Sequence, residues 1–416
     1  MLVNCLIFIA GLLIYAGYGI PGLLYLLGAV ALTYGIGLLI PKCRWLMWVS
    51  ISVLTHYLLL LKLQPVTGFT LLAPMGVSYF SLRLIGYMVD VYKGEYAPER
   101  NIFRFALNMT YLPMLFLGPI SPYQDAASAL RDRKITWEGI GDGLMRLLWG
   151  AFKKLVIAAR LGAVIGTISG DPAQYSGAYA LLAMLLFSVQ LYADFSGGMD
   201  MVLGISRMLG VTLTENFRQP YHSETVKEFW KRWHISLGAW LTKYVYIPLG
   251  GKKKHKALNV IVTFLVSGIW HGIEYLLWGL FNGLLVLCGD HLKTRWKFLN
   301  RLITTIFISF LWAFFIWPTA IQALQMTFSA VIPWNIGDLL QNLSALGLTV
   351  TDWIVLGGSV MLLTLYDFYA QPLKNLWIKL VPWKKTALIG TLGLLVAVLG
   401  MYGIGFNAEA FIYSRF

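Results

Sequence analysis

The sequence predicts an all-α polytopic membrane protein with one domain, residues 1–416. Hydrophobic residues make up 58% of the chain and charged residues only 12%, a balance that ordinary soluble domains do not have. Continuous apolar runs of about 20 residues recur, and each can cross a hydrocarbon core of about 30 Å as a helix. Since the runs do not alternate apolar and polar residues, they favour helices over a transmembrane β-barrel.

The first run, residues 2–20, lacks a basic start and a small-residue cleavage site, so it is interpreted as a retained span rather than a signal peptide. Several later runs are short for a full crossing, and Gly, Pro, Trp and Tyr recur at their ends. We therefore expect roughly eleven crossings, with some segments half-buried or re-entrant. In chain order the candidate spans are 2–20, 22–40, 46–61, 69–91, 103–120, 140–168, 178–195, 201–213, 258–272, 276–289, 303–317, 353–369 and 386–402.

The distribution of Lys and Arg predicts the orientation of the C-terminal third. The loop at residues 318–351 has no Lys or Arg, whereas basic clusters flank the spans on either side of it. Positive residues are retained on the cytoplasmic side, so this loop should be external. The last span then runs outward and places residues 403–416 outside. The members of the two clusters are Lys293, Arg295, Lys297 and Arg301, then Lys374, Lys379, Lys384 and Lys385.

Charge and cysteine content exclude several classes of function. The formal net charge of +14 is dispersed among the apolar runs, which fits loops facing anionic lipid headgroups rather than a nucleic-acid-binding surface. Cys5, Cys43 and Cys288 have neither disulfide nor metal-ligand spacing. We therefore expect membrane lipids as partners, no nucleic acid, and no metal site.

His271 lies in the motif GIWHG, at the centre of an apolar stretch that spans residues 257–289. A histidine at bilayer depth is costly unless it faces a protein interior or a wet cavity. Neutral histidine is suited to remove the proton of a hydroxyl during acyl transfer. Glu274, three residues on, would share its helical face and orient the imidazole. The alternative is a hydrogen bond that only packs helices together.

His234 lies in the basic and aromatic segment EFWKRWHISLGAW, which predicts an amphipathic segment near the inner interface. The histidine is either functional or incidental to that surface. Lys231, Arg232, Lys252 and Lys253 belong to the same cytoplasmic stretch, residues 227–256. These residues either form a solvated loop or bind phosphate groups of an acyl donor.

Two further patterns concern helix interruptions and buried charge. Asp194 and Asp200 fall in the motif DFSGGMD, which is interpreted as a glycine-broken segment. We expect these acids to form structural pairs with Arg207 or Arg218 rather than line a wet funnel. In the run 103–120, Pro113 and Gly118 predict a kinked helix.

The patterns ADFSGGMDMVLGISRMLG, ENFRQPY, EFWKRWHISLGAWLTKYVYIPLGG, SGIWHG and the terminal FIYSRF together resemble the membrane-bound O-acyltransferase (MBOAT) family. The likeness covers a core at about residues 70–290 and a C-terminal motif at residues 411–416. The chain looks most similar to the bacterial membrane subunits of alginate O-acetylation, with the lipoteichoic acid D-alanyl transferase as a near relative.

The resemblance implies a ring of tilted helices around a thin centre, with a tunnel through it. His271 would be the histidine of that tunnel, His234 the second histidine nearer the cytoplasmic mouth, and Trp270 a supporting residue. Tyr413 would receive the acyl group and pass it outward. The implied location is the bacterial cytoplasmic membrane, with the C-terminus external.

The resemblance also implies the reaction. A cytoplasmic thioester, with acetyl-CoA as the expected donor and no bound cofactor, would supply an acetyl group for O-acylation of a cell-envelope or exported polysaccharide. An extracytoplasmic SGNH-type acyltransferase would complete the transfer. D-Alanyl transfer to teichoic acid from a carrier protein is the alternative within the family. A transporter or channel is the alternative of another class, although no paired broken-helix repeat is visible.

Overall fold

The computed structural model describes residues 2–68, 70–332 and 334–402. Within these residues the chain is helical throughout and has no β-strand, only an isolated bridge between Phe217 and Trp233. Six of the described helices are long and apolar enough to cross a membrane, and three shorter apolar helices accompany them. The predicted all-α polytopic class is confirmed, whereas the predicted count of about eleven crossings stays a prediction.

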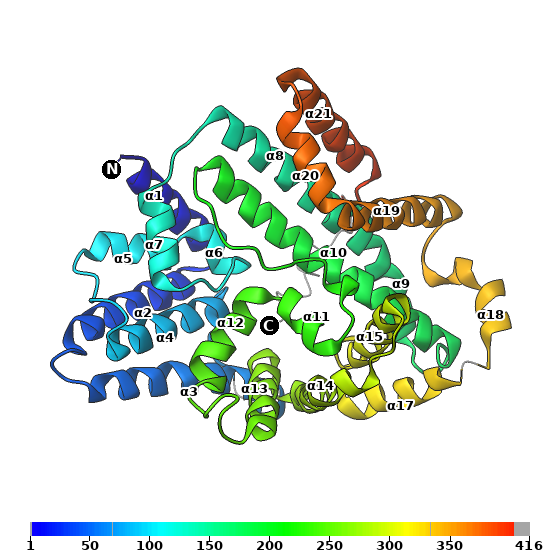
Figure 1. Cartoon of the computed structure of the whole chain (residues 1–416), viewed down its shortest axis with the longest axis horizontal. Helices are drawn as coiled ribbons and strands as arrows, with labels where there is room; N and C mark the ends of the chain where they lie inside the picture. The colour runs from blue at the N-terminus through cyan, green and yellow to red at the C-terminus, as the bar shows by residue number, and fades with distance from the viewer. Residues whose placement is uncertain (1, 69, 333, 403–416) are drawn as a thin grey trace.

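The N-terminal helices form one group on the left of Figure 1 and share a core that contains Tyr15, Leu26, Phe80 and Tyr87. The run expected as one kinked span at 103–120 is divided into two short helices, because Pro113 lies in the first turn of the second one. The helices of this group are α1 (Leu2–Ala16), α2 (Ile20–Leu39), α3 (Trp45–Thr67), α4 (Val77–Lys93), α5 (Ile102–Met109), α6 (Leu112–Phe116) and α7 (Tyr123–Arg131).

Two long helical stretches run side by side above the centre of Figure 1. One consists of α8 (Trp137–Phe152), the π-helical turn η1 (Lys153–Ala158) and α9 (Ala159–Gly170); the other is α10 (Ala178–Met208). Glycines two turns apart on each helix make the contact. A Cβ on Gly143 would lie 2.5 Å from the Gly204 carbonyl oxygen, and one on Gly150 would lie 2.4 Å from that of Gly197. Small residues of this kind let membrane helices approach closely.

The glycines in DFSGGMD do not break a helix, so the expected interruption between 195 and 201 is wrong. α10 runs through them, because their missing side chains serve the contact with α8. The expected structural role of the acids is correct, but the expected partners are not. Asp194 pairs with Lys154 at 2.5 Å, and Asp200 pairs with Lys153 at 2.6 Å and Arg146 at 2.8 Å.

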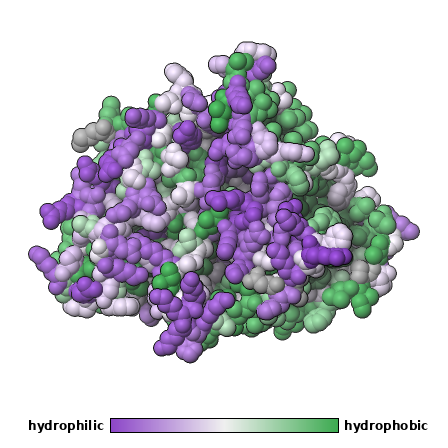
Figure 2. Space-filling model, in the orientation of Figure 1, coloured by the Kyte–Doolittle hydropathy of each residue, from purple (hydrophilic) through white to green (hydrophobic). Residues whose placement is uncertain are grey.

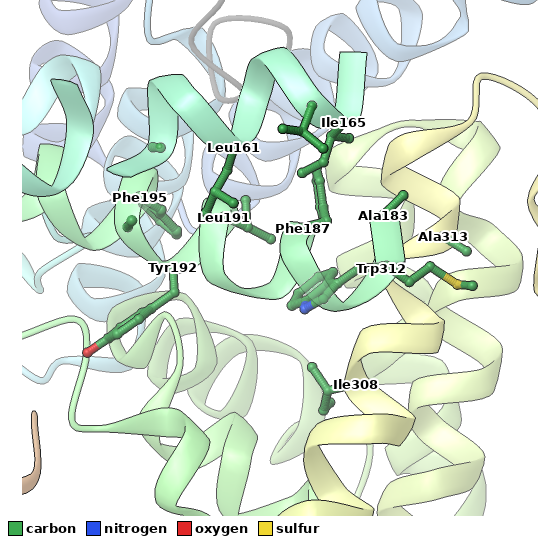
Figure 3. Close-up of a cluster of buried hydrophobic side chains, with 14 of the residues drawn as sticks. Leu161, Ile165, Ala183, Phe187, Leu191, Tyr192, Phe195, Ile308, Trp312 and Ala313 are labelled. Carbon is green, nitrogen blue, oxygen red and sulfur yellow. The ribbon is translucent and has the colours of Figure 1, made fainter. Parts of the chain in front are cut away.

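The largest hydrophobic core joins α10 to α9 and to α15 (Lys297–Leu311). Figure 3 shows Phe187, Leu191 and Phe195 of α10 beside Leu161, with Trp312 on the side of α15. α10 is thereby held on two sides and forms a rigid wall next to the central helices.

Short helices occupy the middle of the molecule, surrounded by longer ones (Figure 1). They are η2 (Pro220–His222), α11 (Val226–Arg232), α12 (Ile235–Leu241) and the π-helical turn η3 (Thr242–Tyr246). A centre built from seven-residue helices is too short to cross a bilayer. The arrangement agrees with the predicted ring around a thin centre.

The remaining helices surround the centre, and α13, α14, α19 and α21 lie within a few residues of predicted spans, whereas α17, α18 and η6 fall in the stretch 318–351 that was expected to be a loop and α20 lies between two predicted spans. α13 and α14 border the centre from below in Figure 1, and α19, α20 and α21 lie at the upper right. The helices are α13 (Lys256–His271), η4 (Ile273–Tyr275), α14 (Leu276–Cys288), η5 (Gly289–Leu292), α16 (Ala313–Ile316), α17 (Ala320–Val331), α18 (Ile336–Gln341), η6 (Leu343–Leu346), α19 (Val350–Phe368), α20 (Ala370–Lys379) and α21 (Pro382–Leu399).

The surface separates polar and apolar residues in the way that a membrane requires. Hydrophilic residues cover much of the face seen in Figure 2, including the region over the central helices, while hydrophobic residues gather along the right and upper edges. α21 has no buried residue, and apolar side chains such as Leu394 and Val398 are exposed on it. Such a helix is stable only against lipid or a partner.

Candidate active site

The central helices border a cavity with a volume of about 530 Å³ that contains both predicted histidines in its wall. Its wall includes the exposed Lys227 and Lys231 of α11 as well as buried aromatic side chains around His271. The cavity is lined by Leu191, Lys227, Trp230, Lys231, Trp233, His234, Ile235, Leu237, Gly238, Ala239, Leu241, Thr242, Lys243, Ile247, Thr263, Phe264, Ser267, His271, Trp278, Val286, Trp312 and Phe315.

His271 is the last residue of α13 and is 6% exposed. Its ring is enclosed by aromatic rings at centroid distances of 4.8 Å for Trp270, 5.5 Å for Trp278 and 5.7 Å for Phe315. α13 and α14 approach closely here, because a Cβ on Gly279 would lie 2.4 Å from the Phe264 carbonyl oxygen. The close contact fixes Trp278 beside the histidine.

Glu274 does not share a helical face with His271, which corrects the expectation from their spacing. α13 ends at His271. Glu274 lies in the next element, the short turn η4, and is exposed. Its carboxylate interacts electrostatically with Lys62 of α3. Because Gly272 ends the helix between the two residues, a separation of three residues no longer places them on one helical face.

His234 separates α11 from α12 and adopts a left-handed backbone conformation, with φ of 46°. This conformation is uncommon for a residue with a side chain and is tolerated where neighbouring structure enforces it. The neighbours do so here, because the Arg218 amide donates to the Arg232 carbonyl and the Ile235 amide to the Asn216 carbonyl. The ring is thereby directed inward, to 3% exposure, 4.9 Å from the ring of Phe195.

Trp270 lies between the two histidines. Its ring centroid is 4.8 Å from that of His271 and 6.2 Å from that of His234, and its indole N–H donates to the Ser78 carbonyl at 3.4 Å. The predicted supporting residue therefore contacts both predicted catalytic side chains and connects them to α4.

Of the four basic residues predicted to bind a donor, only Lys231 lines the cavity. Arg232 is engaged with Glu228 at 2.6 Å, and Lys252 and Lys253 are exposed on a turn that does not border the cavity. Lys227 and Lys243 do line it, and sequence reasoning missed them. Lys227 could have been found, because it lies four residues before Lys231 and so shares its helical face.

Lys243 links the cavity to the N-terminal helices. Its ammonium pairs with Asp90 of α4 at 2.8 Å and with Glu95 at 2.6 Å. Burial alone would lower the pKa of Lys243, but the hydrogen bonds to these two carboxylates raise it above its usual value. The side chain therefore carries a positive charge at the rim throughout the physiological pH range.

Two other predictions concern metal ions and the terminal tyrosine. The described part of the chain holds no group of three or more His, Cys, Asp or Glu residues placed to bind a metal. Tyr413 and the motif at 411–416 lie outside the described residues.

A polytopic helical fold, a thin centre and an internal cavity lined by two histidines define the class: a membrane protein with a chemically equipped internal site. The chain belongs to the membrane-bound O-acyltransferase family, whose profile matches residues 95–332. It is thus a multi-pass membrane enzyme, an O-acyltransferase, as the motifs around His234 and His271 predict.

Several relatives share most of their length with the chain. It is 30% identical over 409 residues to a probable alginate O-acetylase from Pseudomonas syringae pv. tomato, covering 89% of this chain and 78% of the relative. It is 29% identical to a peptidoglycan O-acetyltransferase from Helicobacter pylori, covering 74% and 69%. It is also 26% identical to a teichoic acid D-alanyltransferase from Bacillus subtilis, covering 57% and 65%.

Proposed function

We propose that the enzyme moves an acetyl group from a cytoplasmic thioester, with acetyl-CoA as donor, across the membrane for O-acetylation of a cell-envelope or exported polysaccharide. The observation that carries the proposal is a single cavity that reaches from exposed Lys227 and Lys231 to buried His234 and His271. The lysines bind the phosphates of the donor, and the cavity leads its thioester to the imidazole.

The chemistry requires one base and one hydrogen-bond donor. His271 takes the proton of the acceptor hydroxyl while the hydroxyl oxygen attacks the thioester carbonyl carbon. The carbon–sulfur bond then breaks, and the thiolate leaves with the proton returned by the imidazolium. The indole N–H of Trp278, buried in the cavity wall without an acceptor in the described part of the chain, donates to the developing oxyanion.

The aromatic rings around His271 favour a short acyl group. Trp278 and Phe315 both line the cavity with ring centroids within 6 Å of the imidazole centroid, so these bulky rings leave less room beside His271 for a long acyl chain. The named O-acetylating relatives, which match over more of the chain than the D-alanyltransferases do, point the same way. D-Alanyl transfer from a carrier protein remains the second candidate, since the basic rim would suit an acidic carrier.

The outward step is assigned to Tyr413. Its phenol would attack the thioester with His271 as base, and the acetyl-tyrosine would deliver the group to an extracytoplasmic acyltransferase of the SGNH type. Membrane topology supports this step, because the charge distribution predicts an external C-terminus. Mass spectrometry after incubation with acetyl-CoA should find the adduct on Tyr413, and Tyr413→Phe should abolish it.

The test uses inverted membrane vesicles with labelled acetyl-CoA on their outer face. We expect the wild-type protein to transfer label and His271→Ala to lose at least about 100-fold of the rate at equal protein amounts. His255→Ala is the matched control, because His255 is exposed and does not line the cavity. Undiminished transfer by His271→Ala would contradict the proposal. Transfer from a D-alanyl carrier thioester but not from acetyl-CoA would favour the second candidate.

A further inference from the structure

A second, smaller cavity of about 80 Å³ lies beside the first, between α4 and the helices α12 and η3. Lys243 and Ala239 line both cavities. The polar side chains in the wall of the small one are those of Arg83, Tyr87, Ser121, Tyr123, Trp240, Lys243 and Tyr244. Nothing in the proposed acyl transfer uses this cavity.

Arg83 is a buried cation that bonds only to uncharged groups. Only 4% of the residue is exposed to solvent. The guanidinium donates to the Asn108 carbonyl at 2.8 Å, the Asn108 side-chain oxygen at 2.7 Å and the Met109 carbonyl at 3.3 Å. Its Nε–H has no acceptor among residues 2–68, 70–332 and 334–402. A buried charge without an opposite charge is costly.

The other buried basic residues of the described chain show what is missing at Arg83. Lys153 and Arg160, 3% and 6% exposed, each pair with a carboxylate, Asp200 at 2.6 Å and Asp352 at 3.1 Å. Arg83 forms no ion pair with any described acid. Lys243 already shares its charge with Asp90 and Glu95. Within the described chain, the unmatched positive charge of this cavity therefore belongs to Arg83.

The guanidinium is held in place rather than free to turn to solvent. Asn108, which accepts two of its hydrogen bonds, is itself fixed by donating to the Tyr123 carbonyl at 3.2 Å. Gly86, one turn after Arg83 on α4, keeps the cavity open. A Cβ at this position would lie 3.2 Å from the Tyr244 hydroxyl and 3.4 Å from the Trp240 indole nitrogen.

We propose that this cavity binds one small anion, with Arg83 as its charge partner. A cavity of about 80 Å³ exceeds the roughly 10–15 Å³ that one water needs, so it has room for an ion of a few heavy atoms but not for a nucleotide. The ligand is a halide or a small oxyanion of the size of acetate or phosphate. Bound there, it neutralises the guanidinium and ties α4 to the helix that carries Lys243.

The experiment measures thermal unfolding of the full chain in detergent, in gluconate buffer at constant ionic strength, while chloride, acetate or phosphate replaces gluconate. We expect a saturable rise in the unfolding midpoint with at least one of the three. The separate titrations distinguish a halide or phosphate taken from the medium from acetate, the hydrolysis product of the acetyl group that the enzyme is proposed to transfer. Arg83→Gln should weaken the apparent affinity at least tenfold, whereas Arg131→Gln, an exposed arginine on α7, should not.

Two measurements keep the proposal open to refutation if Arg83→Gln does not fold. Gly86→Ala narrows the cavity without touching Arg83 and should also lower the affinity. If chloride is the anion that raises the midpoint, bromide-soaked crystals should give an anomalous peak next to the guanidinium. The proposal would be overturned if none of the three anions gave a saturable response, if Arg83→Gln responded equally, or if a chloride-responsive protein bound bromide only elsewhere. None of these outcomes depends on acyl transfer, so they do not bear on the proposed function.

Discussion

The ion pairs that join α8 and η1 to α10 predict the effect of replacing Asp200 by Asn. The carboxylate of Asp200 lies 2.6 Å from the ammonium of Lys153, whose side chain is only 4% exposed, and 2.8 Å from the guanidinium of Arg146. Arg146 keeps a second partner, Glu215, at 2.5 Å. Asp200→Asn preserves the size of the side chain but removes the charge, so Lys153 loses its ion-pair partner.

Breaking a buried ion pair by removing one partner costs about 3–5 kcal/mol, whereas replacing both partners with neutral groups is often nearly neutral. Asp367 also interacts electrostatically with Lys153, so we expect a loss near the lower end, about 3 kcal/mol. The double variant Lys153→Met with Asp200→Asn should recover most of this loss. At roughly 2 °C per kcal/mol for a large chain, the single variant should unfold about 6 °C below wild type.

The assay is thermal unfolding in detergent at a single scan rate. Large membrane proteins commonly unfold irreversibly, so the midpoints of two variants can be compared only when both are heated at the same rate. Asp132→Asn is the control, since Asp132 and its partner Arg131 are exposed, and its midpoint should not move. If Asp200→Asn has the same unfolding midpoint as wild type, or if the double variant is no more stable than the single one, the ion pairs of Asp200 do not stabilise the contact with α10.

Three further predictions concern the site and the contact between α8 and α10. Trp278→Phe keeps an aromatic ring and removes the N–H, so kcat should fall about 10²–10³-fold with little change in KM; an unchanged kcat would exclude the indole as oxyanion donor. Phe315→Leu should improve butyryl over acetyl transfer about tenfold or more, and an unaltered preference would show that Phe315 does not limit chain length. Gly150→Ala should destabilise by about 1–3 kcal/mol, while Gly141→Ala, which has open space around it, should not.

His271 could be predicted because a polar residue in an apolar run is rare enough to stand out, and His234 because it lies in a basic and aromatic segment typical of the inner interface. His271 and His234 reach one cavity from segments 37 positions apart, and each lies in a stretch whose composition marks it. Trp270, between them, was expected only from the resemblance to the family. The all-helical fold followed from the apolar runs, whose ends agree with the observed helices to within a few residues in most cases.

The errors arose where the meaning of a residue depends on its neighbours in space. Glycines at 197 and 198 suggest a broken helix in the sequence, but α8 lies against them and the helix continues. Glu274 has helical spacing from His271, but the helix ends between them. Lys243 is far from Asp90 in sequence, and only the packing of η3 against α4 brings it to the rim. In each example the outcome depends on tertiary contacts, which the spacing of residues along the chain does not predict.

The central claim is that donor and His271 meet through the cavity whose open end is lined by Thr242. Thr242 is exposed and borders the cavity, whereas Lys252 is exposed outside it. In a background with Cys5, Cys43 and Cys288 replaced by Ser, a bulky maleimide on Thr242→Cys should abolish acetyl transfer, and acetyl-CoA should protect that cysteine from labelling. The same label on Lys252→Cys should leave transfer intact. Full activity with Thr242→Cys completely labelled would contradict the account.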